Sequence, residues 1–347
     1  MTPRSPRAFL RTLALALALA AAAAALGEFA ARLPLVRRAL PAPSIGSGHR
    51  RLDIKLELLD RFVREEGRLD CLFLGASDVN LGISPEEFGR AYASQGGKEI
   101  AAFNFGLDGF IPAAAAVMAD ILVKKYRPRW LIWGISPASF SDNLQRKTPQ
   151  IVRRHPWCRH MTGSFNLEGW LCEHSAAYRY FLRFRIWLER PEYSRGLSQR
   201  EARTLRTGEP ARSHDDLTGV WGAEFEREAR RRRVLEGFAF NPESLAALDA
   251  VAGLGRQTRV VLLEVPVHPR FYGLYGNGVA DHQKALLRIG KKAERGGALF
   301  LSPPRELVPE AGFANSNHMN GWGAGVFSRW LGSRLKQAVS IGELGEP

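Results

Sequence analysis

Short apolar runs alternate with amphipathic stretches along most of this chain. The apolar runs are typical of strands buried on both faces of a parallel sheet, and they occupy residues 71–75, 100–105, 130–135, 259–265 and 298–302. Helical patterns separate or follow them, at residues 85–94, 111–125, 242–251, 281–294 and 322–339. The alternation predicts an α/β fold, a three-layer sandwich in which helices cover both faces of a five-stranded parallel sheet.

The N-terminal segment has a different pattern. Arg4, Arg7 and Arg11 precede an uncharged run over residues 12–27, which is the arrangement of an export signal. Sixteen helical residues reach about 24 Å, less than the ~30 Å of a bilayer core. The run could therefore be a cleaved signal, or an uncleaved single-pass anchor extended by the milder stretch 29–36. In both cases residues 1–39 form a signal or anchor segment, and the main domain lies in the periplasm or another extracytoplasmic compartment.

Residues 141–240 interrupt the alternation of strands and helices. They are rich in arginine and aromatic residues and include a polar tract at 194–216. We expect a mostly helical insertion with a flexible loop, lying over the carboxyl edge of the sheet, whose role could be substrate cover, partner contact or membrane contact. The insertion divides an α/β domain at 70–340, and a linker with a leading helix fills 40–69.

The charge balance favours an anionic partner. The chain carries 49 Lys and Arg against 35 Asp and Glu, a formal net charge of +14. Nucleic acid, phospholipid headgroups and acidic glycans all satisfy this preference, but an export signal argues against nucleic acid. The four arginines at 230–233 are interpreted as a solvated helix face.

The three cysteines give little functional information. Cys71 lies in a predicted buried strand and is interpreted as a core residue. Cys158 and Cys172 lie in the insertion, where an exported chain could pair them. No Cys/His spacing suggests a metal site.

Candidate chemistry lies where the predicted strands end. Ser77 follows the first strand and Gly109 follows the second, so both would stand at one crevice, because ligands of open parallel sheets bind at the carboxyl ends of the strands. His318 comes just before the last predicted helix.

Three sequence blocks resemble those of the SGNH (GDSL-type) hydrolase superfamily. They are "LFLGASD", "FNFGLDG" and "NSNHMNGWGA", and the similarity covers residues 70–137 and 258–336. The resemblance is greatest to membrane-anchored extracytoplasmic branches, which include the teichoic acid D-alanyl transfer protein and the alginate O-acetylation proteins. It implies a flavodoxin-like fold, with Ser77 as nucleophile, His318 as base and the Gly109 N–H as a donor to the oxyanion. The Ser77 N–H would be a second donor.

Two positions depart from the family pattern. Ser136 stands where the family has an asparagine that donates to the oxyanion, and its hydroxyl could still donate, with shorter reach. Asn315 stands where the family has the acid of the triad. An amide can orient the imidazole but cannot stabilise imidazolium as a carboxylate does, and the corresponding Asp-to-Asn change in a serine protease lowers kcat by about 10⁴. Compensation could come from a Ser–His dyad or from another carboxylate: Asp78, Asp108, Asp281 or Glu264.

Each candidate also has a purely structural interpretation. Ser77 could cap a helix, Gly109 could serve a turn, and His318 could be a capping or core histidine. His268 could touch substrate or be a loop histidine braced by prolines. The remaining candidates are auxiliary: Asp78 could cap the helix or tune Ser77, while Asn104 and Asn320 would fix loops.

The sequence therefore predicts an exported, membrane-associated serine esterase or O-acyltransferase. By the resemblance, it would act through a Ser77 acyl-enzyme on an envelope polysaccharide or glycan, without a cofactor or metal. A membrane-bound O-acyltransferase would be its partner. The alternative is a catalytically impaired scaffold that binds glycan or such a membrane partner, and the replacements at Asn315 and Ser136 favour it.

Overall fold

The computed structural model describes residues 6–142, 152–219 and 235–347. Within these residues, one sheet of five parallel strands forms the centre of the molecule: β1 (Cys71–Gly75), β2 (Ala102–Gly106), β3 (Trp130–Ile135), β4 (Arg259–Glu264) and β5 (Leu299–Leu301). The strand order is β2-β1-β3-β4-β5, the flavodoxin-like order of a doubly wound sheet. The predicted α/β class and all five strand positions are confirmed.

Helices cover both faces of the sheet because alternate strand residues point to opposite sides. Leu72 and Leu74 pack in a core with α3 (Arg50–Glu66), α6 (Pro112–Tyr126), α13 (Pro242–Ala252) and α14 (Val279–Arg295). Cys71 and Phe73 pack in a second core, with α4 (Ser77–Gly82), α5 (Pro85–Ser94) and α15 (Gly321–Ser340). The short 3-10 turns are η1 (Pro137–Phe140), η4 (Gly253–Arg256), η5 (Pro269–Leu274) and η6 (Glu310–Gly312).

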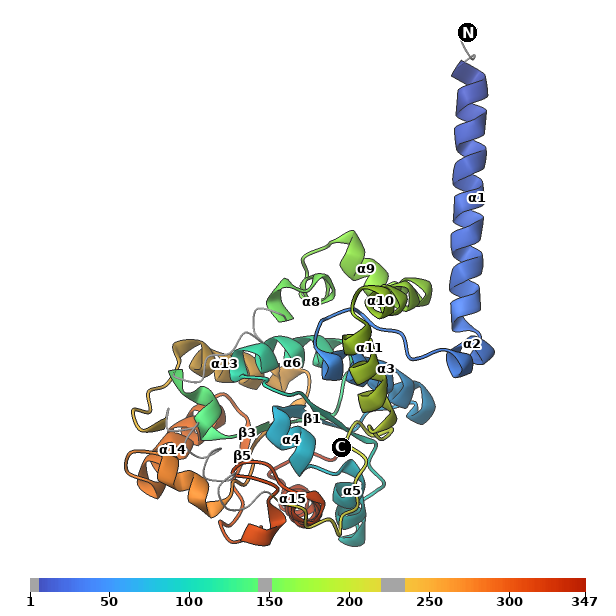
Figure 1. Cartoon of the computed structure of the whole chain (residues 1–347). Coiled ribbons are helices and arrows are strands. Elements are labelled where there is room, and N and C mark those ends of the chain that lie inside the picture. Colours follow the sequence, from blue (N-terminus) through green and yellow to red (C-terminus); the bar gives the residue numbers. More distant parts are fainter. Residues whose placement is uncertain (1–5, 143–151, 220–234) are drawn as a thin grey trace.

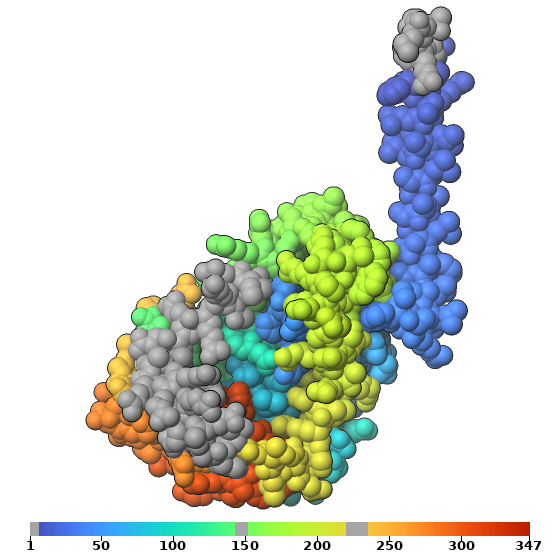
Figure 2. Space-filling model, viewed as in Figure 1, coloured from blue at the N-terminus to red at the C-terminus, as the bar shows by residue number. Residues whose placement is uncertain are grey.

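A long N-terminal helix stands apart from this sandwich (Figures 1 and 2). Helix α1 spans Pro6–Arg32, and the short α2 (Pro34–Ala39) follows it. The stretch Arg7–Arg32 is long and apolar enough to cross a membrane, and in the described chain no other helix is. The helix continues past the apolar run that the sequence marks, and its 27 residues reach about 40 Å.

The insertion is helical, as expected. Its described helices stack outside α3 and α6 (Figure 1): α8 (Pro156–Met161), α9 (Leu167–His174), α10 (Ala176–Glu189) and α11 (Pro191–Ala202). Residues 143–151 and 220–234 of the insertion lie outside the described residues, so its expected position over the carboxyl edge stays a prediction. Helix α11 occupies the first part of the tract 194–216. The rest runs along the edge strand β2, where the Asn104 N–H donates to the Thr207 carbonyl at 2.8 Å.

Cys158 and Cys172 are free, buried thiols, so the disulfide that an exported chain could form is absent here. Both side chains are about 1% exposed and pack in the core beside Trp157. Cys71 is a core residue, as predicted. The four arginines at 230–233 lie outside the described residues.

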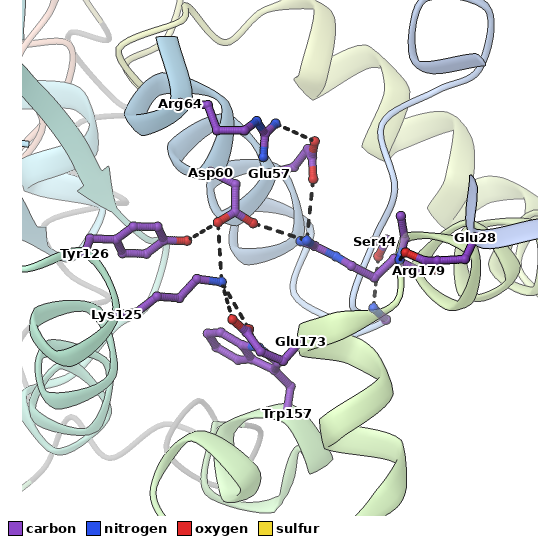
Figure 3. A network of polar contacts seen from close by, with 12 residues as sticks. Glu28, Ser44, Glu57, Asp60, Arg64, Lys125, Tyr126, Trp157, Glu173 and Arg179 are labelled. Carbon is purple, nitrogen blue, oxygen red and sulfur yellow. Dashed lines mark hydrogen bonds and ion pairs between the residues drawn. The ribbon is translucent and has the colours of Figure 1, made fainter. Parts of the chain in front are cut away.

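A network of buried charges joins the insertion to the sandwich (Figure 3). The Asp60 carboxylate of α3 contacts Lys125 at 3.3 Å and Arg179 at 3.2 Å, and accepts from the Tyr126 hydroxyl at 2.7 Å. Although burial opposes ionisation, the two cations lower the pKa of Asp60. Lys125 also pairs with Glu173 of α9 at 2.9 Å, so α3, α6, α9 and α10 are held as one unit.

The helix that carries Ser77 packs directly on β2 because Gly106 has no side chain. A Cβ at Gly106 would lie 2.3 Å from the backbone nitrogen of Asn80 and 2.7 Å from its Cα. Since the obstacle is backbone, it cannot move without shifting α4.

We expect Gly106→Ala to lower the free energy of unfolding by about 1–3 kcal/mol, because overpacking must displace α4 from β2. Gly89→Ala is the matched control: Gly89 lies within α5, a Cβ there would meet only open space, and alanine should stabilise by about 0.5–1 kcal/mol. Denaturant unfolding of the two variants measures the difference. Equal stabilities would show that α4 does not depend on this close approach.

Candidate active site

Ser77 is placed by a tight connection from β1 into α4. Gly75 ends the strand with φ 158, and a Cβ there would lie 2.6 Å from the Gly134 carbonyl oxygen. Ala76 caps the helix and Ser77 is its first residue. The Ser77 N–H belongs to the first turn, so it has no partner within the helix.

His318 comes from a narrow loop between η6 and α15. An isolated antiparallel bridge pairs Phe313 with Met319, and the Ala314 N–H donates to the His318 carbonyl at 2.8 Å. The loop brings the His318 Nε2 to 2.8 Å from the Ser77 Oγ, although 241 residues separate them in the chain. This distance is a hydrogen bond and is within reach for proton transfer.

Ser77 and His318 open into a hollow of about 150 Å³ at the carboxyl edge of the sheet, as predicted for the crevice. Gly109 lines it in the left-handed region at φ 68, which favours glycine. Within the described residues, the N–H groups of Ser77 and Gly109 donate to no acceptor. The other lining residues are Ala76, Asp78, Phe110, Ile111, Ser136, Ala138, Ser139, Phe271 and Asn317.

Ser136 contributes a further polar group to the hollow. Its side chain is buried, and its Oγ has no hydrogen-bond partner in the part of the chain that the structure describes. A buried hydroxyl without a partner is costly unless a ligand or water satisfies it. The Ser136 hydroxyl and the N–H groups of Ser77 and Gly109 could therefore serve an oxyanion, which requires preorganised donors.

The Asn315 side chain lies behind His318, with its amide in a fixed orientation. Asn315 Oδ1 accepts from the N–H of Asn317 at 3.1 Å and from the N–H of His318 at 3.0 Å. Because an amide nitrogen cannot accept these bonds, Nδ2 must face the ring, and it lies 3.0 Å from His318 Nδ1. Asn315 therefore donates to Nδ1.

This orientation selects a tautomer of His318. A ring nitrogen that accepts a hydrogen bond carries no proton, so the neutral imidazole is protonated at Nε2. The Nε2–H then donates to Ser77 Oγ and cannot take the proton of the hydroxyl. An aspartate at 315 would keep both backbone bonds with one oxygen and accept from Nδ1–H with the other, leaving Nε2 free to act as base.

The auxiliary candidates divide between the hollow and its supports. Asp78 lines the hollow, and its Oδ1 accepts from the Val79 N–H at 2.8 Å. Asn104 donates to the carbonyls of Val79 and Ile83, and Asn320 caps α15, so both fix loops as expected.

His268 is not among the residues that line the hollow. It caps η5 by accepting from the Arg270 N–H at 3.1 Å, and its ring packs on Phe313. Burial lowers the pKa of His268. Of its two interpretations, this placement favours the loop histidine.

The other three carboxylates that could have compensated for Asn315 lie elsewhere. Asp108 pairs with Arg51 at 2.5 Å, Asp281 accepts from the Asn277 N–H at 2.9 Å, and Glu264 accepts from the Ser302 hydroxyl. None of the three lines the hollow.

Two residues that contact the segments bearing Ser77 and His318 were not predicted from the sequence. Asn317 lies in the block that contains His318, and its Nδ2 is 3.5 Å from Nε2. Its Oδ1 has no partner among the described residues, and a half-turn of the amide would let it accept from Nε2–H.

Arg212 comes from the insertion and donates to the Leu81 and Met319 carbonyls, which ties α4 to the His318 loop. No motif marks it, since the insertion matches no block.

Comparison with known proteins found no matching family model, no matching curated protein and no matching solved structure. The SGNH resemblance thus remains an expectation from the three sequence blocks.

We predict that neutral His318 carries its proton on Nε2, and that Asn315→Asp moves the proton to Nδ1. The reason is the change at position 315 from a donor to an acceptor facing Nδ1. Ring ¹⁵N chemical shifts of selectively labelled histidine, read by long-range ¹H–¹⁵N correlation, distinguish the two tautomers. An Nδ1–H resonance pattern in the unaltered protein would contradict the orientation of Asn315.

Proposed function

We propose that the hollow is a serine acyl-transfer site and that the protein is an esterase or O-acyltransferase. The observation that carries the proposal is the 2.8 Å contact between Ser77 Oγ and His318 Nε2. Beside it lie the N–H groups of Ser77 and Gly109, which have no acceptor among the described residues. A serine hydroxyl becomes a competent nucleophile when a histidine accepts its proton.

The reaction would begin from the Nδ1–H tautomer of His318. Ser77 Oγ attacks the ester carbonyl while Nε2 takes the hydroxyl proton, and the N–H groups of Ser77 and Gly109 bind the oxyanion. The leaving alkoxide then takes that proton from Nε2, which leaves an acyl-enzyme on Ser77. Water or an acceptor hydroxyl then gives its proton to Nε2 and attacks the acyl carbonyl, and Ser77 Oγ takes the proton back from Nε2 as the acyl group leaves.

The proposal also includes the location of the domain, its substrate and its partner. The apolar α1 would serve as an anchor that holds the domain outside the cytoplasm. The net charge of +14 suits an acidic envelope polysaccharide or glycan. The family resemblance adds a membrane-bound O-acyltransferase as the partner that supplies the acyl group.

The orientation of Asn315 favours a second candidate function. Because the amide holds His318 as a donor to Ser77, His318 in this tautomer cannot act as the base. A protein with such a site could act as a scaffold that binds glycan or a membrane acyltransferase in the same hollow.

Fluorophosphonate labelling of the full chain in detergent tests the proposal. We expect slow labelling of the unaltered protein, none of Ser77→Ala, and labelling of Asn315→Asp that is about 10²–10⁴ times faster, since a carboxylate restores the base. Asn317→Asp is the matched control, because it adds the same charge beside Nε2 rather than Nδ1.

The outcomes separate the two candidates. If only the Asn315→Asp variant is labelled and the unaltered protein is not, the proposal of an active enzyme is contradicted and the scaffold is supported. If neither the unaltered protein nor the Asn315→Asp variant is labelled at Ser77, and neither hydrolyses p-nitrophenyl acetate, acyl transfer at this hollow is ruled out.

We also expect Ser136→Ala to lower the rate of ester hydrolysis by about 10²-fold through loss of an oxyanion donor. Its stability should change by less than about 1 kcal/mol, because the hydroxyl has no partner in the described chain to lose. Ser139→Ala is the comparison: its Oγ donates to the Ser136 carbonyl at 2.7 Å, so its removal should affect stability more than rate. Unchanged hydrolysis in Ser136→Ala would exclude Ser136 from the oxyanion site.

A further inference from the structure

The insertion exposes several large apolar side chains in and just before α9 and along α10, the helix whose first residues contact α1. This apolar face consists of residues that are between 41% and 74% exposed: Phe165, Trp170, Phe181, Phe184, Trp187 and Leu188. On α10, positions 181, 184 and 188 follow the i, i+3, i+7 spacing of one helical side. A soluble surface rarely gathers so many aromatic residues, and such a patch marks an interaction site.

The apolar face is fixed relative to α1 through Glu28. The Glu28 carboxylate accepts from the N–H groups of Ala176 and Ala177 at 3.0 and 3.1 Å, and from the Ser175 hydroxyl at 2.8 Å. Arg32 adds a bond to the His174 carbonyl at 3.0 Å.

This attachment fixes the position of α10 along the axis of α1. Glu28 is the residue at which the uncharged run of α1 ends, so α10 begins at the level where the apolar span stops. Figures 1 and 2 show α9 and α10 beside the C-terminal part of α1, on the side of the domain nearest the N-terminus. The charge network of Figure 3 then ties α9 and α10 to α3 and α6.

Basic side chains surround the apolar face. Those on α2, α8 and α10 and just beyond α10 are exposed and, within the described residues, pair with no carboxylate: Arg37, Arg38, Arg159, Arg185 and Arg190. They outnumber the exposed acids Glu168, Glu189 and Glu192. Aromatic residues flanked by arginine are typical of surfaces that enter the headgroup region of an anionic bilayer.

We propose that the apolar face of α9 and α10 lies in the surface of the anionic bilayer that α1 crosses. The occupant is lipid because α10 begins at the end of an apolar helix, and because the arginines near the face pair with no carboxylate among the described residues. The inference depends on the proposed anchorage by α1. The domain then has two membrane contacts, a spanning helix and an interfacial helix, which restrict how it can tilt.

Three leucines of similar exposure allow a matched test in the full chain. Leu188 lies in the apolar face, Leu287 on α14 and Leu15 within α1, and they are 58%, 60% and 62% exposed. Each is changed to cysteine and labelled with an environment-sensitive fluorophore. Burial raises the pKa of Cys158 and Cys172 to about 12, and Cys71 is also buried, so the native thiols should not react.

The labelled proteins are placed in vesicles of equal parts phosphatidylcholine and phosphatidylglycerol that contain a spin-labelled lipid. With the spin label near the headgroup, we expect quenching at Leu188→Cys at least about twice that at Leu287→Cys, since interfacial helices enter the headgroup boundary. With the spin label deep in the chains, Leu15→Cys should be quenched most.

Positions 15 and 188 distinguish failure of the membrane anchor from failure of the interfacial contact. Quenching at position 15 with equal, weak quenching at 188 and 287 would leave the anchor standing and overturn the interfacial contact, freeing the face for a protein partner. Absence of quenching at position 15 would show that α1 does not insert, and the inference would fall with it.

Discussion

The side chain of Asn104 in β2 joins the parts of the molecule that carry the candidate site. Its Nδ2 donates to the carbonyls of Val79 and Ile83 in and after α4, and its Oδ1 accepts from the Gly106 N–H. Its backbone carbonyl accepts from buried Lys55 of α3 at 2.8 Å, and its N–H donates to the insertion. Burial lowers the pKa of Lys55 well below its usual value. Because these groups have no access to water, the loss of Asn104 would leave several of them unsatisfied, and Ser77 would lose its position.

The geometry of the hollow favours a catalytic site, whereas the tautomer of His318 favours a site that only binds a ligand. Ser77, Gly109 and Ser136 line one hollow, and Arg212 ties α4, which bears the serine, to the loop that bears the histidine. Asn315 reverses the hydrogen bond between Ser77 and His318, because its amide can only donate to Nδ1. One atom at position 315 thus decides whether the same arrangement abstracts a proton or only binds a ligand.

The insertion connects the site to the base of α1. Its C-terminal part lies along β2 and contacts α4 and the His318 loop through Arg212, while the start of α10 binds Glu28 near the end of α1. The position of the domain relative to α1 therefore follows from packing and half-buried charges, and not from the length of a linker. Cys158 and Cys172 are buried as free thiols within this packing.

The sequence by itself determined the sheet, its covering helices and the meeting of Ser77 and Gly109, because buried parallel strands are continuous apolar runs and their carboxyl ends share one edge. That Ser136 and His318 join them was expected only from the family resemblance. It also marked Asn315 as the departure that matters. Only the tertiary structure decided which way that amide points, since two backbone N–H groups of its own loop orient it. The path of the insertion was likewise decided by contacts between residues far apart in the chain, such as Asp60 with Arg179, which leave no local pattern to recognise.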